Sequence, residues 1–532
     1  MSKRTLILAF ASFFTLGLFA RQYQITQINY TLEGNGAKIF GRTQPYALEN
    51  NVPVEKNQIF ETEEELNEYI LEYTIKLNNL RAFEKIEVTY ETAASDSGED
   101  TQPKEDEICP VTLNVSVKDS FHLFAMPGPK YDSNTGLTFK LKVKDTNFLG
   151  SLNTFSSDFY FLLPTDESDG SDTKFGLDFN IDYPFKAGIF DALWLNDFNF
   201  SYTLGDELPE WNIGTGIRFT LPFEKNSLVL EMNQKFVNNY KYQNYGDNIY
   251  FVDDIKFSVP VIVTKLNYFG NIFYTPYASF SANWDFDYIS KINSDLSSPI
   301  FTVGHELSFG RIDWMQNFRT GLTFSLDNYY SYNLQRQRFY PIIEVESKAF
   351  AHAELLQDYN FLRNIGVAAD VRFFTYLYNP NKDEKYINDG KSIGSYLRGI
   401  RDSQIYAGRE DSLSSLTPTS AFILNLDFPV NIITTDFTKS FMRYFNFEMQ
   451  VSPFIDFALC YNKITHTFCN LKDGFYAGGV EVIVYPLKWS GITIRASVGM
   501  DIGRKFFSDK INMDWREDLS MYEFSFGFGL HY

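Results

Sequence analysis

Residues 524–532 read FSFGFGLHY. Every second position carries a large apolar side chain, namely Phe524, Phe526, Phe528, Leu530 and Tyr532. Because successive side chains of a strand point to opposite faces, this pattern predicts a strand with one apolar face. An aromatic residue at the end of such a strand is typical of transmembrane barrels. We therefore expect this segment to be the closing strand of a barrel.

The same alternation recurs from about Lys130 onward, in runs such as FGLDFNIDYPF, GIRFTLPF and SLVLEMNQKF. Polar connectors such as PTDESDGSDT separate the runs. Lipid does not tolerate open sheet edges, so strands that span a membrane must close on themselves. At roughly 9 to 11 residues per tilted strand, with loops of similar total length, about 16 antiparallel strands are expected. The predicted class is an all-β transmembrane barrel over residues 121–532.

Composition supports a membrane barrel over a soluble β-sandwich. Aromatic residues make up 17% of the chain, with 53 Phe and 34 Tyr, yet the mean hydropathy is only -0.23. A wall that alternates lipid-facing and water-facing residues has this combination, whereas a soluble core would use more aliphatic residues. The net charge of -20 disfavours nucleic acid as a partner, since nucleic acid requires a cationic surface. Solubility of the loops and the lumen is the simplest reason for this charge.

The first twenty residues have the pattern of a secretory signal peptide. Lys3 and Arg4 precede an apolar run that ends at Ala20, a plausible cleavage residue. The run is too short to span a membrane as a helix. Secretion followed by strand-forming sequence indicates a bacterial outer-membrane protein.

Residues 21–120 are expected to form a separate α+β domain. Thr62 and Glu65 form a capping box, which is a signal for a helix start. Apolar residues follow at helical spacing, at Leu66, Tyr69, Ile70, Tyr73 and Leu77. A shorter helix is expected near Thr43–Leu48, strands are expected at Gln24–Tyr30, Phe83–Tyr90 and Val111–Val117, and a solvated loop is expected at Glu91–Glu107.

No pattern in the chain indicates catalysis, a metal or a cofactor. The five His residues are scattered, and neither a nucleophile elbow nor a phosphate-binding loop is present. We therefore predict a protein that is not an enzyme, the alternative being a dyad assembled from distant strands. Of the three cysteines, Cys460 and Cys469 either bridge the base of a hairpin loop or are unpaired thiols. Both readings are equally compatible with the spacing.

Several motifs, in order, resemble those of the BamA, TamA and FhaC superfamily of outer-membrane proteins. Residues 21–120 resemble a single POTRA module, through GNG at Gly34–Gly36, LNNLRAFEKIEVTY and VTLNVSV. KYDSNTGLTFKLKVKDTNFLG at Lys130–Gly150 resembles the first barrel strand and the loop that follows it, and IDYPF resembles a later strand end. The resemblance implies a 16-stranded barrel of the bacterial surface antigen type. No plug helix is recognised before the POTRA-like domain.

The motif YLRGI resembles the family's arginine-glycine-aromatic signature, in the long loop that folds back into the barrel. Leu397, Arg398, Gly399 and Ile400 form its centre, with Ile400 in place of the usual aromatic residue. The resemblance implies that Arg398 reaches Asp456 in FIDFA, where an ionised side chain on a spanning strand must face the lumen. Asn425 stands where many relatives carry Glu, so Glu448, eight residues before Asp456, is the candidate second partner. The alternative is that Arg398 is a solvated loop cation like Arg401.

The function implied by the resemblance is insertion of outer-membrane proteins or translocation of polypeptides. Substrate strands would pair with backbone at the POTRA edge and at the barrel seam, which requires no catalytic residue. The expected partners are unfolded outer-membrane or secreted polypeptides and the lipid bilayer, with periplasmic or lipoprotein accessory factors as further candidates. The alternative is a passive pore or surface-structural barrel whose POTRA domain is only a spacer.

Overall fold

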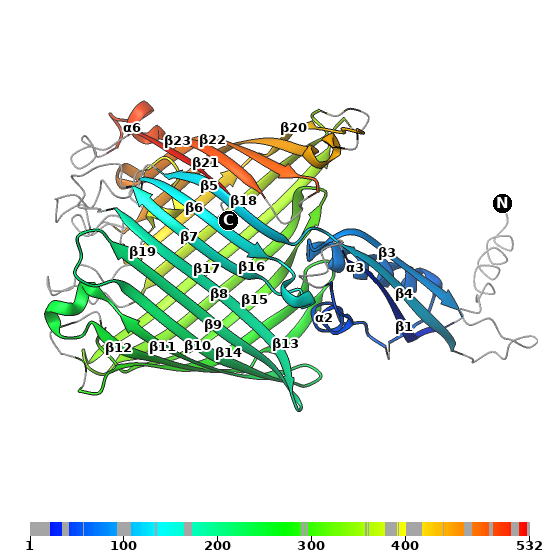
Figure 1. The fold of residues 1–532 in the computed structure, drawn as a ribbon, viewed down its shortest axis with the longest axis horizontal. Helices are drawn as coiled ribbons and strands as arrows, with labels where there is room; N and C mark the ends of the chain where they lie inside the picture. Colours follow the sequence, from blue (N-terminus) through cyan, green and yellow to red (C-terminus); the bar gives the residue numbers. More distant parts are fainter. Residues whose placement is uncertain are drawn as a thin grey trace, which may run out of the picture. The chain divides into compact units, whose positions relative to one another are not determined.

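The structure is a computed structural model (Figure 1), and it describes residues 22–34, 42–56, 58–92, 108–132, 136–163, 173–287, 289, 293, 296–356, 359, 361–377, 391, 393–400, 418–439, 441–461, 471–488, 493–511 and 521–528. The predicted signal peptide, most of the loop predicted at Glu91–Glu107, Cys469, Leu530 and Tyr532 lie outside these ranges. The chain divides into two compact units, Met1–Ser120 with Leu149–Leu152, and Phe121–Phe148 with Asn153–Tyr532.

The first unit is a four-stranded sheet with two helices. Its elements are β1 (Tyr23–Glu33), α2 (Pro45–Asn51), β2 (Ile59–Phe60), α3 (Glu63–Asn79), β3 (Phe83–Thr92) and β4 (Cys109–Asp119). The strand order is β2-β1-β4-β3, with β1 parallel to β4 and the other pairs antiparallel. The three strands and two helices predicted from sequence are therefore present.

Helix α3 packs its apolar stripe on this sheet. Leu66, Tyr73 and Leu77 are buried among side chains of β1 and β4, including Ile25 and Leu113. The Thr62 hydroxyl accepts a hydrogen bond from the Glu65 backbone nitrogen (3.1 Å), as the capping box predicts. The Glu65 carboxylate accepts its reciprocal bond from the nitrogen of Glu61, one residue earlier than expected. None of the helices in the described ranges is both long and apolar enough to cross a lipid bilayer.

The second unit is a closed antiparallel barrel, whose tilted strands are seen in Figure 1. Its strands are β5 (Leu123–Asp132), β6 (Gly136–Asp145), β7 (Phe155–Leu163), β8 (Lys174–Ala187), β9 (Phe190–Thr203), β10 (Glu210–Pro222), β11 (Ser227–Asn238), β12 (Ile249–Ser258), β13 (Val261–Leu266), β14 (Gly270–Trp284), β15 (Ile300–Met315), β16 (Phe318–Asn333), β17 (Arg338–Glu354), β18 (Asn364–Tyr376), β19 (Ser420–Asp427), β20 (Val430–Thr434), β21 (Phe447–Cys460), β22 (Phe475–Pro486), β23 (Ile494–Asp501) and β24 (Tyr522–Phe528). Short helices lie in its connections, namely η1 (Phe148–Gly150), η3 (Tyr240–Tyr245), η7 (Gly394–Tyr396), η8 (Met442–Phe445), η9 (Leu471–Asp473) and α6 (Ile502–Phe506).

The strand number is within two of the expected value of about 16. Segments β12 and β13 both pair with β14, and β19 and β20 both pair with β18 and β21. Each of these pairs is one strand interrupted near a proline, Pro260 or Pro429, because proline cannot donate to the ladder. Within the described ranges the wall therefore has eighteen positions. Short turns explain the two additional positions, since β8 and β9 are joined by two residues, as are β15 and β16.

Side chains alternate between an apolar outer face and a polar lumen. Tyr277 on β14 donates a hydrogen bond to Asp327 on β16 (2.9 Å), across the intervening β15. Such a bond forms only on the concave side of the wall, so Asp327 faces the lumen. On the same strand Tyr330 and Tyr332 have the opposite phase and are exposed on the outside. This alternation is the pattern of a lipid-facing barrel.

Strand β24 closes the barrel by pairing with β5. Ser525 pairs with Asp132, and Phe526 pairs with Tyr131. Phe524 and Phe526 are exposed on the outer face, and Phe528 is the last residue of β24.

Candidate functional site

The segment Ile393–Ile400, here called the docked loop, lies against the inner wall of the barrel. It belongs to the long connection between β18 and β19 and contains the short helix η7. Ile393, Leu397 and Ile400 are almost fully buried. Their burial provides the apolar contact that holds the loop in place.

The wall beneath the docked loop departs from the polar character of the lumen. The inward positions there are apolar, at Phe374, Ala421, Ile423, Ala458, Cys460, Phe475 and Ala477. These residues come from β18, β19, β21 and β22, and together with the loop they form one cluster. Three of these residues, Ala421, Ala458 and Ala477, have small side chains, which leave room for the loop backbone to approach the wall. Ala458 is itself buried in this contact.

Arg398 is the central polar residue of the docked loop, and the structure brings it to Asp456. Its Nε and Nη2 atoms donate to the two Asp456 oxygens at 2.9 and 2.7 Å. The Arg398 backbone nitrogen donates to the same carboxylate at 2.9 Å. The guanidinium also lies 3.8 Å from the centre of the Phe454 ring. With 7% of its surface exposed, Arg398 is not a solvated loop cation.

The second acidic partner of Arg398 is Asp427. Arg398 Nη1 and Nη2 donate to the two Asp427 oxygens at 2.8 and 3.1 Å. A planar guanidinium can bind two carboxylates in this forked manner, which an ammonium group cannot do. Glu481 on β22 lies further away, 3.8 Å from Nη1, and is 3.6 Å from Arg495 on β23.

The prediction that Glu448 is the second partner is wrong. Glu448 does lie on the inward face of β21, but its carboxylate accepts hydrogen bonds from Asn317 (2.8 Å) and Gln450 (2.7 Å). At a rise of about 3.3 Å per residue, eight residues separate it from Asp456 by more than 25 Å, which is too far for one guanidinium. Asp427 had a signal in the sequence, because it lies two residues after Asn425 and therefore on the same face of β19.

Asn425 also contacts the docked loop, through its amide. Its Nδ2 atom donates to the carbonyl oxygen of Tyr396 at 2.7 Å. A glutamate at this position has no donor to offer a carbonyl when it is ionised. The Tyr396 ring is held in turn by Arg372, whose guanidinium lies 4.3 Å from the ring centre. Arg372 is paired with Asp370 at 2.8 Å.

Gly399 brings the tip of the loop to the far strands of the wall. It has a φ of 93°, a conformation that residues with a Cβ atom rarely adopt. Its backbone nitrogen donates to the Glu523 carboxylate on the closing strand β24. Glu523 was not among the residues predicted from the sequence. The sequence does indicate its orientation. Glu523 lies between Tyr522 and Phe524, which face outward, so its side chain must face the lumen.

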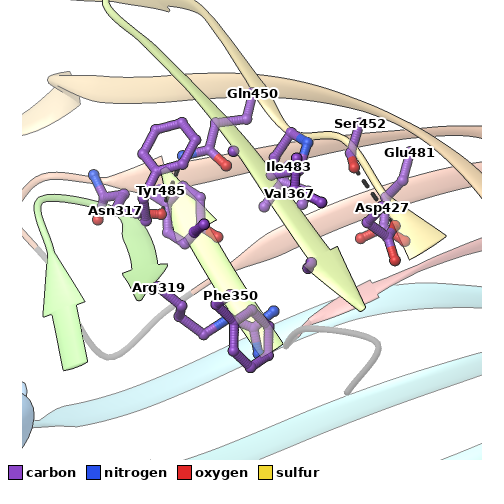
Figure 2. Close-up of a pocket in the computed structure, with 15 residues that line it drawn as sticks. Asn317, Arg319, Phe350, Val367, Asp427, Gln450, Ser452, Glu481, Ile483 and Tyr485 are labelled. Atoms are coloured by element: carbon purple, nitrogen blue, oxygen red, sulfur yellow. Dashed lines mark hydrogen bonds between the residues drawn. The ribbon is translucent and has the colours of Figure 1, made fainter. Parts of the chain in front are cut away.

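A small cavity of about 50 Å³ lies beside the Arg398 site on the inner wall (Figure 2). Asp427, Ser452 and Glu481 line one end, and Figure 2 shows the Ser452–Asp427 hydrogen bond there. Arg319 lies against the Phe350 ring, 4.0 Å from its centre, on another side. Asn317, Gln450 and Tyr485 line the end at which Glu448 is bound. The cavity therefore separates Glu448 from Arg398.

Comparison with known proteins gave matches among solved structures. No protein-family model matches the chain, and no curated protein does. The chain is similar to CdiB from Acinetobacter baumannii, with 11% identity, coverage of 95% of this chain and 74% of that one, and a TM-score of 0.48. It is also similar to BamA from Haemophilus ducreyi lacking POTRA domains 1–3 (12% identity, coverage of 94% and 84%, TM-score 0.36). A third similar structure is CdiB from Escherichia coli (7% identity, coverage of 97% and 92%, TM-score 0.36).

Proposed function

We propose that this chain is an outer-membrane barrel of the BamA, TamA and FhaC type that inserts or translocates polypeptides. The N-terminal unit would be a single POTRA-like domain in the periplasm. The ordered sequence motifs support this proposal, as does the docking of Arg398 on Asp456. An apolar outer face around a charged lumen is what a membrane barrel requires.

The observation that carries the proposal is the short pairing between β24 and β5. Among the described residues, these strands share two residue pairs. By comparison, β23 and β24 share seven, and β5 and β6 share ten. Among the described residues, the seam between β24 and β5 is therefore held by fewer pairs than the strand joins on either side of it. An unpaired strand edge presents backbone donors and acceptors to which an extended polypeptide can add.

The N-terminal sheet offers a second edge for strand addition. Strand β2 pairs only with Tyr23 and Gln24 of β1, so Ile25–Glu33 has no strand partner on that side within the described part of the chain. This edge contains neither Lys nor Pro, the residues that usually protect an edge. The opposite edge, β3, carries Glu84, Lys85 and Glu87. Strand β1 is therefore the edge at which we expect a substrate segment to pair.

Both edges recognise backbone rather than a particular side chain. The proposed substrates are accordingly unfolded outer-membrane or secreted polypeptides, bound at β1 and at the seam. Such binding proceeds without a catalytic residue, because backbone hydrogen bonds supply the affinity and side-chain pockets supply the selectivity.

Depletion of the protein, followed by quantitative proteomics of the outer membrane and the medium, tests this function. The proposed function predicts loss of a defined set of barrels or secreted proteins at unchanged transcript levels. A passive pore predicts intact proteins with altered solute uptake, and that result would contradict the proposal.

A further inference from the structure

Glu523 links the docked loop to the strand that closes the barrel. It lies on β24 in the phase opposite to the exposed Phe524, so its side chain faces the lumen. There its carboxylate accepts a hydrogen bond from the backbone nitrogen of Gly399. Gly399 follows Arg398 directly, so the loop tip binds Asp427 and Asp456 with one residue and β24 with the next.

The loop backbone reaches β24 because two glycines face each other. A Cβ atom on Gly399 would lie 2.4 Å from the backbone nitrogen of Met500, and a Cβ atom on Gly499 would lie 2.6 Å from the Cα atom of Gly399. Neither position therefore accommodates a larger residue. Gly499 is on β23, the neighbour of β24, so the loop lies flat on the last two strands of the wall.

Strand β24 is also the strand with the short pairing at the seam. Glu523 lies two residues before Ser525, which pairs with Asp132 of β5. A displacement of β24 away from the seam would carry Glu523 with it. Either the hydrogen bond between Gly399 and Glu523 must then break, or Arg398 must leave Asp427 on β19 and Asp456 on β21.

We infer that Glu523 is a positioning residue that couples the docked loop to the seam, so that undocking of the loop and opening of the seam favour each other. The inference rests on the proposed function, which gives the seam its role. Coupling between two sites is reciprocal, so closing the seam must stabilise the docked loop by the same factor.

The experiment measures loop docking with the seam closed and open. Ser525→Cys and Asp132→Cys are introduced at directly paired positions, with Cys109, Cys460 and Cys469 replaced by Ala in every protein compared. The purified protein, in lipid vesicles, is studied oxidised and reduced. An arginine-specific protease then reports undocking, through the rate at which the Arg398–Gly399 bond is cleaved, measured by mass spectrometry. This bond is protected while Arg398 is buried.

We expect oxidation of the seam to slow this cleavage by roughly 5- to 150-fold, the usual range for coupling between sites. Glu523→Ala should cleave faster and should lose most of the dependence on oxidation. Glu523→Gln retains an acceptor of a weaker, neutral hydrogen bond and should fall between the two. Glu231→Ala is the matched control, because Glu231 is a carboxylate of β11 that binds Arg218 and Asn233 and does not touch the loop. It should behave like the parent protein.

The inference would be overturned if oxidation slowed cleavage in both Glu523 variants by the same factor as in the parent protein. Heat-modifiable migration on gels confirms that each variant is assembled, and Glu523→Gln alone decides the matter if Glu523→Ala does not assemble. No substrate is present in this measurement. A failed coupling therefore leaves the proteomic test of the proposed function intact, and a failed proteomic test leaves the coupling intact.

Discussion

Asp456 accepts three hydrogen bonds from Arg398, two from the guanidinium and one from the backbone nitrogen. The carboxylate is fully buried, and the guanidinium is nearly so. Removing one member of such a pair leaves an unpaired buried charge, which costs about 3 to 5 kcal/mol. The pair therefore holds both the loop side chain and the loop backbone at one point of the wall.

Arg398→Ala and Asp456→Ala should each impair function and accelerate protease cleavage within the long β18–β19 connection. The double variant should lose little more than either single one, because the two residues act as a unit. Complementation of a depleted strain measures function. Strictly additive losses, or a normal phenotype for Arg398→Ala, would contradict the role of this pair.

Asp427→Ala should destabilise the docked loop, whereas Glu448→Ala should leave docking unchanged. Asp427 is bonded to Arg398, while Glu448 is bonded to Asn317 and Gln450 at the other end of the cavity. The cost of Asp427→Ala should be about 1 to 3 kcal/mol, since Asp456 still compensates the guanidinium. Cleavage of the Arg398–Gly399 bond measures both variants, and equal rates would show that the assignment of Asp427 is wrong.

Asn425→Asp replaces the donor to the Tyr396 carbonyl by an acceptor of the same shape. The lost hydrogen bond and the repulsion between the two oxygens should weaken docking by about 1 to 3 kcal/mol. Asn425→Gln keeps the amide and serves as the control for altered packing. If Asn425→Asp is cleaved no faster than the parent protein, the amide contributes nothing to docking.

Most of the architecture was predictable because strand alternation is local. The apolar phase of FSFGFGLHY predicts the outward Phe524 and Phe526, and the helix signals at Thr62 and Glu65 predict α3. The strand number was not predictable to better than two. It depends on how many residues the turns contain, and a run such as Phe318–Asn333 does not reveal where an adjacent turn of two residues begins.

The candidate site was predictable only in part. Its residues come from different strands, and the register between those strands decides which of them lie close together. The sequence resemblance implies Arg398 and Asp456, which the structure brings together. Asn425 pairs with Asp456 across β19 and β21, and Asp427 is the next inward-facing residue of β19. Only this register identifies Asp427, and not Glu448, as the second partner of Arg398. Glu523 belongs to a strand that meets the loop only once the barrel has closed. No spacing within one segment contains that information.

Replacing Tyr532 by Ser should reduce the amount of assembled barrel. The sequence pattern predicts that Tyr532 belongs to the closing strand, where an aromatic residue is favoured at the membrane interface and is expected to be read by the assembly machinery. The fraction of heat-modifiable protein in isolated outer membranes measures assembly, with Tyr532→Phe as the control that keeps the aromatic ring. Unchanged assembly of the Ser variant would refute this prediction.

Sealing the seam between β24 and β5 tests the proposed handling of polypeptides most directly. Cells depleted of the native protein would express the cysteine-replaced protein with Ser525→Cys and Asp132→Cys, oxidised or reduced. A matched disulfide from Thr302→Cys and Ser331→Cys joins β15 and β16, where the two hydroxyls are 2.7 Å apart, far along the wall from the seam. We predict that the oxidised seam variant fails to restore the dependent outer-membrane or secreted proteins, that reductant restores them, and that the control disulfide has no effect. Full restoration by the oxidised seam variant would contradict polypeptide handling at the seam.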